Sequence, residues 1–315
     1  MTQPPLTIVN QINAEFGAFL AGLDGAPRVI DQAGTDRPWE LPEETDVLFT
    51  RARGWRAAPD TPPALPRLKW VQTYSAGIEN YPDWLKNGRI VTTGRGLTSP
   101  QIAEYVLAAM LRVEKDLDRL RARSPADWTE SPLGTLEGKT LGVVGYGAIG
   151  QEVVQRAAGF GMRILASRRS AWTSPDPRVT ACADARAVVA ESDHLVLALP
   201  LTDQTRRSFD AEMFALARPG QHLVNVSRGG IVDQEALMAA LDSGRLSFAT
   251  LDVTDPEPLP EGHPLWTHPK VLLTPHVSYI GGPEMARFRT KTRDNLRAFL
   301  AGTPMTDVVS LDRGY

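Results

Sequence analysis

Three glycines, Gly145, Gly147 and Gly150, form the pattern G-x-G-x-x-G, which can bind the pyrophosphate of a dinucleotide. The first glycine permits a tight turn, the second lets the backbone approach the phosphates, and the third lets a helix pack on the preceding strand. An apolar run over 141–144 precedes the glycines, and helical periodicity over 153–160 follows them. The sequence therefore predicts a strand, a tight turn and a helix whose N-terminus faces the phosphates.

Three ionisable residues follow the glycine motif, each at the end of a predicted strand. Arg228 lies in LVNVSRGGIVD, Glu257 in LDVTDPEPLPEGHPLW and His276 in LLTPHVSYIGG. Because the carboxyl ends of the strands line the ligand crevice in an open parallel sheet, the three side chains are candidates for one site. Taken singly, each also has an ordinary explanation: a surface charge, a solvated loop carboxylate, and a residue that caps a helix or loop.

The elements that would position these residues form two α/β units. Apolar strands alternate with helices from the glycine motif onward, which favours a parallel sheet covered on both faces. The first 98 residues show short strands of the same kind. A helix is predicted to begin at Ser99, with proline at its first position, to cross between the units and to run to about Arg123. A long amphipathic helix is predicted over 283–300.

Composition and charge exclude several classes of function. The chain is 42% hydrophobic and 23% charged, and its net charge of -3 gives no reason to expect nucleic acid or an anionic membrane as a partner. Its one cysteine, Cys182, excludes an internal disulfide, and no apolar stretch approaches the roughly 20 residues that span a bilayer. The N-terminus lacks the pattern of a secretory signal. We therefore expect a cytoplasmic protein, and we predict no metal site.

The segments around these candidates closely resemble the D-isomer-specific 2-hydroxyacid dehydrogenases. The resemblance is carried by VNVSRGGIVDQEAL, LDVTDPEPLP with HPLW, TPH, LPLTDQTR and the closing GTPMTDVVSLDRGY. YSAGIENYP is similar to the family's substrate loop, and LDVTDPEPLPEGHPLW is most similar to the glyoxylate/hydroxypyruvate reductase subgroup. The resemblance implies two Rossmann-like domains with doubly wound parallel sheets and a cleft between them. The expected domains are a flavodoxin-like substrate-binding domain of residues 1–98 and 283–315, and a dinucleotide-binding Rossmann domain of residues 99–282.

The resemblance implies reduction of a small 2-oxo acid to the D-2-hydroxy acid by hydride transfer from a nicotinamide cofactor. His276 would be the acid/base, because imidazole exchanges a proton near neutral pH. Glu257 would orient His276 and favour its protonated form. Arg228 would bind the substrate carboxylate and polarise the keto group. The family's substrate loop, whose backbone N–H groups hold the other side of the carboxylate, maps to Ala76, Gly77 and Ile78.

The residues at the end of the second predicted strand of the dinucleotide-binding domain indicate whether NAD(H) or NADP(H) binds. An NAD-type site carries an Asp or Glu about 20 residues after the glycines, but this strand ends in ILASRRS. We therefore predict NADP(H) in preference to NAD(H), with Arg168 and Arg169 binding the 2′-phosphate; the alternative is that both are solvated loop charges. Asp252 matches the family's aspartate that fixes the nicotinamide carboxamide. The residues expected to contact the cofactor are Gly145, Tyr146, Gly147, Ala148, Ile149, Gly150, Ser167, Arg168, Arg169, Leu199, Pro200, Val226, Ser227, Asp252 and His276.

Some features allow more than one interpretation. Arg51 and Arg53 end a strand that faces the cleft in the family, and they either contact substrate or lie on the surface. Tyr279 either shapes the substrate pocket or packs at the domain seam. Family members are commonly homodimers, so we expect one here, although the apolar helix face over 102–113 fits a buried intrachain helix equally well. The alternative function is a cofactor-sensing binding protein, because the C-terminal binding protein co-repressors share this fold and the Arg-Glu-His set.

Overall fold

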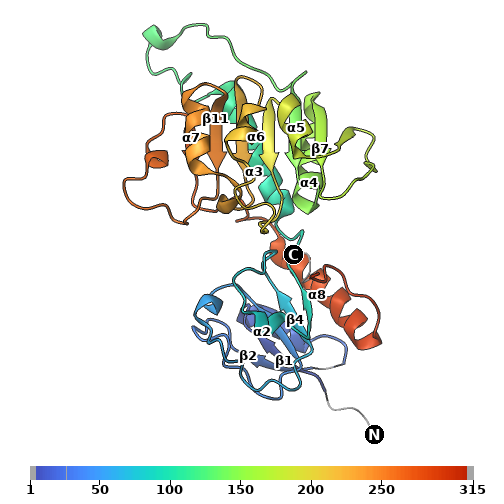
Figure 1. Ribbon diagram of the computed structural model, residues 1–315. Helices are drawn as coiled ribbons and strands as arrows, with labels where there is room; N and C mark the ends of the chain where they lie inside the picture. Colours follow the sequence, from blue (N-terminus) through green and yellow to red (C-terminus); the bar gives the residue numbers. More distant parts are fainter. Residues whose placement is uncertain (1–4, 26, 311–315) are drawn as a thin grey trace. The chain divides into compact units, whose positions relative to one another are not determined.

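The computed structural model describes residues 5–25 and 27–310 and is shown in Figure 1. The chain divides into two compact units, Met1–Leu97 with Pro283–Tyr315, and Thr98–Gly282. Each unit is built on one sheet whose neighbouring strands all run parallel. The predicted α/β class with parallel sheets is therefore confirmed, and the roles expected of the two units remain predictions.

The first unit contains a five-stranded sheet in the order β2-β1-β3-β4-β5, which is the order of flavodoxin-like folds. Successive residues of a strand point to opposite faces. Ile8 packs in one apolar cluster, whereas the next residue, Val9, packs in the other. Burial on both faces explains why the central strands of this sheet read as short, largely apolar runs. The elements are β1 (Thr7–Asn10), α1 (Ala14–Ala21), β2 (Arg28–Asp31), β3 (Val47–Thr50), β4 (Trp70–Thr73), α2 (Asp83–Lys86), β5 (Ile90–Thr92) and α8 (Glu284–Ala301).

The second unit contains a seven-stranded sheet in the order β12-β11-β10-β9-β6-β7-β8. The chain runs outward from β6 to β8 and then returns to β9 on the other side of β6, so the strand order switches between β6 and β9. Ligands of open parallel sheets bind at the carboxyl ends of the strands at such a point. The elements are α3 (Ser99–Lys115), β6 (Thr140–Val144), α4 (Ala148–Ala157), β7 (Arg163–Ser167), β8 (Val179–Cys182), α5 (Ala185–Glu191), β9 (His194–Leu197), α6 (Ala211–Ala215), β10 (Gln221–Asn225), α7 (Gln234–Asp242), β11 (Leu246–Leu251) and β12 (Val271–Leu273).

Helix α3 starts where the sequence predicts but ends at Lys115, not near Arg123. The next residue, Asp116, has a φ of 39°, a left-handed backbone conformation that stops the helix. The apolar face of α3 packs with residues of α4 and β6 inside the second unit, where Val106 is fully buried. Of the two interpretations of this face, the buried intrachain helix is the one that the structure supports.

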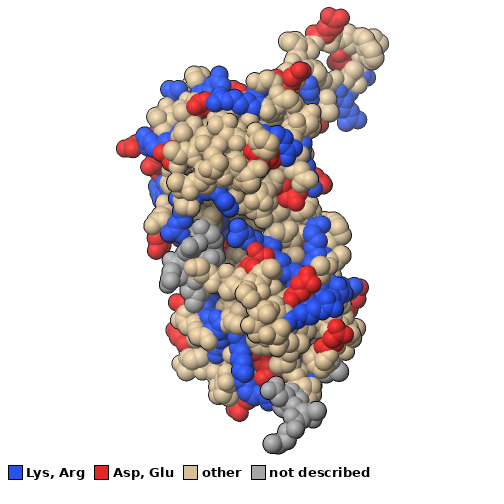
Figure 2. All heavy atoms as spheres, turned by 90° about the vertical axis from the view of Figure 1, so that its right-hand side faces the viewer, with Lys and Arg blue, Asp and Glu red and all other residues tan. Residues whose placement is uncertain are grey.

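Basic and acidic side chains are interspersed over the face drawn in Figure 2, as expected for a net charge of -3. Across the described ranges 5–25 and 27–310, no helix is both long enough and apolar enough to cross a membrane. The same ranges contain no group of three or more His, Cys, Asp or Glu side chains placed to hold a metal ion.

A chain of buried polar side chains crosses the core of the second unit. The carboxylate of Glu114 accepts a hydrogen bond from Lys139 Nζ at 2.5 Å and lies 3.0 Å from His194 Nε2. His194 Nδ1 lies 3.0 Å from His222 Nδ1, and His222 Nε2 lies 3.0 Å from Thr250 Oγ1. Burial raises the pKa of Glu114, but hydrogen bonds from His194 and Lys139 outweigh burial and hold this pKa at about 2. Burial lowers the pKa of His222 well below 6.5, so its ring is neutral in the folded protein.

We expect His222 to make the free energy of unfolding fall by about 1.4 kcal/mol between roughly pH 7.5 and pH 5.5. Below its ordinary pKa of 6.5 this imidazole takes up a proton in the unfolded chain but not in the folded one, so added protons favour unfolding. Urea unfolding of the wild type and of His222→Gln at both pH values measures the difference. If the variant loses as much stability on acidification as the wild type, this explanation is wrong.

Candidate active site

The predicted strand, turn and helix of the glycine motif are present as β6, residues 145–147 and α4. Gly145 has a φ of 100°, and a Cβ there would lie 2.6 Å from the backbone carbonyl carbon of Ala198. A Cβ on Gly150 would lie 2.6 Å from the carbonyl oxygen of Gly145. Both positions therefore require glycine, the first because of the turn and the second because α4 approaches the turn closely. The strand, the turn and the helix are therefore arranged as the motif predicts, and binding of a dinucleotide pyrophosphate at the N-terminus of α4 remains a prediction.

The end of β7 lies beside the glycine turn. The carbonyl oxygen of Ser167 accepts hydrogen bonds from the backbone N–H groups of Gly145 at 3.1 Å and Tyr146 at 3.0 Å. Ser167 itself is buried, whereas Arg168 and Arg169, which follow it, are exposed. The turn and the basic end of the strand are therefore linked by main-chain hydrogen bonds.

The loop that carries Arg228 is organised by Asn225, the last residue of β10. The Asn225 side chain donates to the carbonyl oxygen of Arg228 at 3.1 Å and accepts from the N–H of Ser227 at 3.1 Å. Arg228 Nη1 in turn donates to the carbonyl oxygen of Ser227 at 2.8 Å. A Cβ on Gly229 would lie 1.9 Å from the carbonyl carbon of Thr254, so glycine lets this loop pass directly against the loop after β11.

His276 and Glu257 form a hydrogen-bonded pair. His276 Nδ1 lies 2.6 Å from Glu257 Oε1, and both side chains remain partly exposed. The ring of Tyr279 meets the ring of His276 edge-on, with centroids 5.6 Å apart. Tyr279 therefore contacts the candidate acid/base residue inside the second unit, and both roles considered for it remain predictions.

Asp252 fixes the loop that carries His276. Its buried carboxylate accepts from Thr274 Oγ1 at 2.6 Å and from the N–H groups of Val277 at 2.9 Å and Ser278 at 3.0 Å. The sequence predicts a contact of Asp252 with the nicotinamide carboxamide, which remains a prediction. The structure shows that Asp252 also positions the loop of His276. The sequence did not reveal this role, because the contacts join residues more than twenty positions apart.

The candidate residues of the second unit gather along one edge of its sheet. Because β10, β11 and β12 are adjacent parallel strands, the loops at their carboxyl ends are neighbours. Ser227 Oγ also hydrogen-bonds to the carbonyl oxygen of Leu199, which ties the loop after β10 to the loop after β9. At this edge lie residues 145–150 after β6, Ser167, Arg168 and Arg169 at the end of β7, Leu199 and Pro200 after β9, Val226, Ser227 and Arg228 after β10, Asp252 and Glu257 after β11, and His276 after β12.

The candidate substrate loop follows β4 in the first unit. Ser75 Oγ donates to the carbonyl oxygen of Gly77 at 2.8 Å, and the N–H of Gly94 donates to the carbonyl oxygen of Ser75 at 2.9 Å. Ala76 is exposed, whereas the side chain of Ile78 is part of an apolar core cluster. The loop is thus tied down at both sides of its exposed residue, and its contact with substrate remains a prediction.

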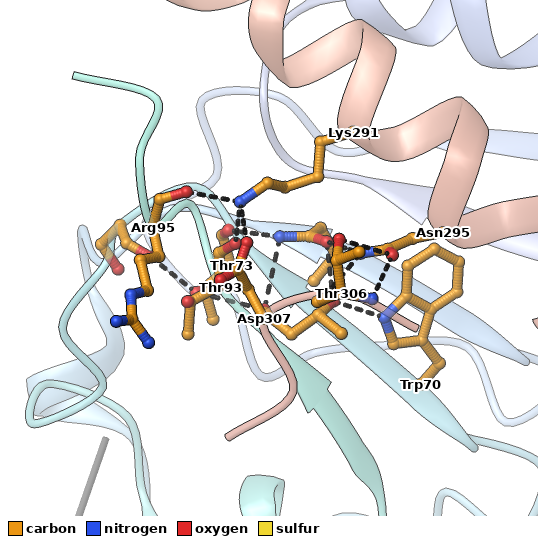
Figure 3. A network of polar contacts seen from close by, with 11 residues as sticks. Trp70, Thr73, Thr93, Arg95, Lys291, Asn295, Thr306 and Asp307 are labelled. Carbon is orange, nitrogen blue, oxygen red and sulfur yellow. Dashed lines mark hydrogen bonds and ion pairs between the residues drawn. The ribbon is translucent and has the colours of Figure 1, made fainter. Parts of the chain in front are cut away.

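A polar network supports the segment that holds this loop (Figure 3). Lys291 Nζ of α8 donates to the carbonyl oxygens of Thr93 at 3.2 Å and Arg95 at 2.5 Å and to the carboxylate of Asp307 at 2.6 Å. The N–H of Thr93 donates to the carbonyl oxygen of Asp307 at 3.2 Å. Lys291 and Asp307 therefore fix residues 93–95, which contact the substrate loop through Gly94.

The two arginines near the start of the chain differ in their surroundings. The Arg51 guanidinium lies over the ring of Tyr74, with its carbon 4.4 Å from the centroid, next to the candidate substrate loop. Arg53 makes a 3.5 Å pair with Asp36, and both side chains are highly exposed. The structure therefore favours a surface role for Arg53 and places Arg51 beside Tyr74.

The chain matches known proteins over most of its length. The model of the D-isomer specific 2-hydroxyacid dehydrogenase NAD-binding domain matches residues 105–278. Glyoxylate/hydroxypyruvate reductase A of Serratia proteamaculans is 31% identical over 303 residues, which cover 90% of each chain.

Solved structures agree with this match. A D-isomer specific 2-hydroxyacid dehydrogenase from Xanthobacter autotrophicus Py2, in complex with NADPH and MES, is 29% identical, with a TM-score of 0.82 and coverage of 99% of this chain and 100% of that one. An NADPH-dependent glyoxylate/hydroxypyruvate reductase from Sinorhizobium meliloti, in complex with NADP and sulfate, is 26% identical, with a TM-score of 0.79 and coverage of 99% and 100%. The strand–turn–helix, the edge of the sheet and these matches together show that the chain belongs to the D-isomer-specific 2-hydroxyacid dehydrogenase family, in the glyoxylate/hydroxypyruvate reductase subgroup.

Proposed function

We propose that this protein reduces a small 2-oxo acid of the glyoxylate or hydroxypyruvate type and prefers NADPH to NADH. The observation that carries the proposal is the 2.6 Å hydrogen bond between His276 Nδ1 and Glu257 Oε1, in loops that follow adjacent strands. With Nδ1 engaged, Nε2 is the atom of the imidazole that exchanges a proton with the substrate. Relatives named glyoxylate/hydroxypyruvate reductase support the substrate class.

The reaction consumes one hydride and one proton for each 2-oxo acid, and a reduced nicotinamide bound at the glycine turn would supply the hydride to C2. His276 donates the proton from Nε2 to the carbonyl oxygen, which gives the D-2-hydroxy acid where C2 is chiral. Glu257 holds the ring through Nδ1 and balances its positive charge. Arg228 binds the substrate carboxylate with its fork of N–H donors and stabilises negative charge that develops on the carbonyl oxygen. The loop of Ala76, Gly77 and Ile78 is proposed to bind the same carboxylate through its N–H groups.

The substrate class is tested by following NADPH oxidation with a panel of 2-oxo acids. We expect the highest kcat/KM with glyoxylate or hydroxypyruvate, and lower values with pyruvate and with 2-oxo acids that carry larger side chains. A preference for a bulky 2-oxo acid would show that the family assignment is right but the substrate proposal is wrong.

The cofactor preference is proposed to rest on Arg168 and Arg169. No carboxylate occupies the end of β7, where it would repel a 2′-phosphate, and both exposed guanidinium groups follow Ser167 at the edge that holds the glycine turn. We expect wild-type kcat/KM to be higher with NADPH than with NADH. Arg168→Asp should lower kcat/KM for NADPH by about tenfold or more and should raise it for NADH, because one charge-assisted contact is lost and a ribose-binding carboxylate is gained. Arg163→Asp, at the other end of β7, is the matched control, and a wild-type preference for NADH would contradict the proposal.

We also infer that the protein forms a homodimer, as family members commonly do. The segment over 116–135 reaches away from the sheet of the second unit (Figure 1) and carries exposed apolar side chains. Trp128 is 86% exposed, Leu117 is 70% exposed and Leu133 is 47% exposed. Three large exposed apolar side chains on one segment support a protein–protein interface there, because exposed apolar surface that gathers in one place marks such sites.

Trp128→Ser is expected to shift the protein from dimer towards monomer, because it removes the largest exposed apolar side chain of the 116–135 segment. Light scattering after gel filtration measures the mass, for which one chain contributes 34.4 kDa. Trp266→Ser, which also changes an exposed tryptophan but outside this segment, should remain dimeric. A monomeric wild type, or equal effects of the two substitutions, would count against this interface.

A further inference from the structure

We propose that Trp172 is a positioning residue for cofactor selection: it packs on Tyr146 of the glycine turn and so holds Arg168 where the 2′-phosphate of NADP(H) binds. This inference rests on the proposed NADP(H) preference and names a residue outside the glycine motif and the arginine pair. It concerns the loop over 168–178, which connects β7 to β8 and in which the sequence motifs give a role to Arg168 and Arg169 but not to Trp172.

The first evidence is an aromatic stack between the loop and the glycine turn. The rings of Tyr146 and Trp172 are nearly parallel, at 26°, with centroids 4.9 Å apart. The guanidinium carbon of Arg168 lies 5.5 Å from the centre of the Trp172 ring. Tyr146 is the residue between the first two glycines of the motif, so this stack joins the pyrophosphate turn to the basic end of β7 through side chains.

The second evidence is that charged residues of the same loop act electrostatically on Tyr146. Burial raises the pKa of Tyr146, the Asp176 carboxylate raises it further, and the charges of Arg178 and Arg168 lower it. The charges of these three loop residues therefore all influence one side chain of the glycine turn. Arg178 is held by Asp176 through hydrogen bonds of 2.6, 2.9 and 3.2 Å, so the loop is braced internally as well.

Trp172 is held by packing. Within residues 5–25 and 27–310, its buried indole N–H has no hydrogen-bond partner. Its contribution is therefore the flat apolar surface of the ring, which stacks on Tyr146 and attracts the Arg168 guanidinium. Phenylalanine preserves much of that surface without losing any hydrogen bond, whereas leucine and alanine do not provide an aromatic face.

The stack of Trp172 beside Arg168 should affect the binding of NADP(H) but not that of NAD(H). Arg168 is exposed and follows a strand end, so without the ring beside it the side chain must be ordered when the phosphate binds, at a cost in entropy. NAD(H) has no 2′-phosphate and does not use Arg168. Loss of the Trp172 ring should therefore weaken binding of NADP+ and leave binding of NAD+ unchanged.

Isothermal titration calorimetry with NADP+ and NAD+ tests this directly. We expect Trp172→Ala to raise the Kd of NADP+ by about tenfold, with the Kd of NAD+ within about twofold of wild type. Trp172→Phe should keep most of the NADP+ affinity. Trp172→Leu should behave as the alanine variant does, and it fills more of the space if the alanine variant fails to fold.

A double-mutant cycle separates positioning from a general structural effect. If Trp172 acts through Arg168, Trp172→Ala in an Arg168→Ala background should change the Kd of NADP+ by less than about twofold. Equal losses for NADP+ and NAD+, or a full effect in the Arg168→Ala background, would overturn the inference and leave the NADP(H) proposal standing. A wild type that binds NAD+ more tightly than NADP+ would overturn both.

Discussion

His276→Ala is expected to lower kcat for 2-oxo acid reduction by about 10²- to 10⁴-fold, the range that removal of a general acid/base produces. The Nδ1 atom of the His276 imidazole lies 2.6 Å from the carboxylate of Glu257, so its other nitrogen can deliver a proton. Single-turnover measurements with NADPH and glyoxylate report the chemical step without product release.

Two further variants are compared with His276→Ala: one changes its hydrogen-bond partner, and the other changes a histidine elsewhere. Glu257→Gln keeps a hydrogen-bonding group beside His276 but removes the negative charge, so we expect a smaller loss than for His276→Ala. His268→Gln changes a histidine that pairs with Asp242 instead, and it should leave kcat unchanged. A His276→Ala enzyme that retains more than about a tenth of wild-type kcat would show that another group supplies the proton.

Arg228→Gln is expected to lower kcat/KM for glyoxylate by about 10²- to 10³-fold, the loss found when one preorganised donor to a developing negative charge is removed. The loop that presents this arginine is fixed by Asn225 and passes against Thr254. Arg228 Nη1 also donates to the carbonyl oxygen of Ser227 at 2.8 Å, so the guanidinium is oriented before substrate arrives. Steady-state kinetics over a range of 2-oxo acid concentrations gives the value.

Arg228→Lys should recover only part of this loss, because an ammonium group cannot reproduce the planar fork of a guanidinium. Arg218→Gln is the matched control, since Arg218 forms an exposed pair with Asp193 before β10 begins. Full activity of Arg228→Lys would indicate that charge alone is needed, and full activity of Arg228→Gln would remove Arg228 from the mechanism.

The sequence predicted the features of the fold that depend on local chemistry. The glycine turn was predictable because Gly145 and Gly150 occupy positions where a Cβ has no room, and such positions leave a fixed spacing in the chain. The central strands were predictable because both of their faces are buried, as in β1, β3 and β6, so their sequences are largely apolar. Arg228, Glu257 and His276 could be assigned to one edge because parallel strands end on the same side of a sheet.

Other features follow from contacts between distant residues and have no local pattern. The Thr274 hydroxyl is an example. It donates a hydrogen bond to Asp252 and lies 2.7 Å from the hydroxyl of Tyr105, which is far earlier in the chain. The Tyr146–Trp172 stack likewise joins the glycine motif to the loop between β7 and β8, whose sequence shows no hydrophobic periodicity. The end of α3 was misjudged because Asp116 adopts a left-handed conformation without being a glycine.

The central claim is that this chain transfers a hydride from NADPH to a small 2-oxo acid and that His276 supplies the proton. The most direct measurement is NADPH oxidation by the wild type and by His276→Ala with saturating glyoxylate, together with calorimetric binding of NADPH to both proteins. We predict turnover by the wild type, a loss of at least about 10²-fold in the variant, and NADPH binding by both. NADPH binding by the wild type without reduction of glyoxylate, hydroxypyruvate or any other 2-oxo acid would contradict the claim and would favour a cofactor-sensing protein.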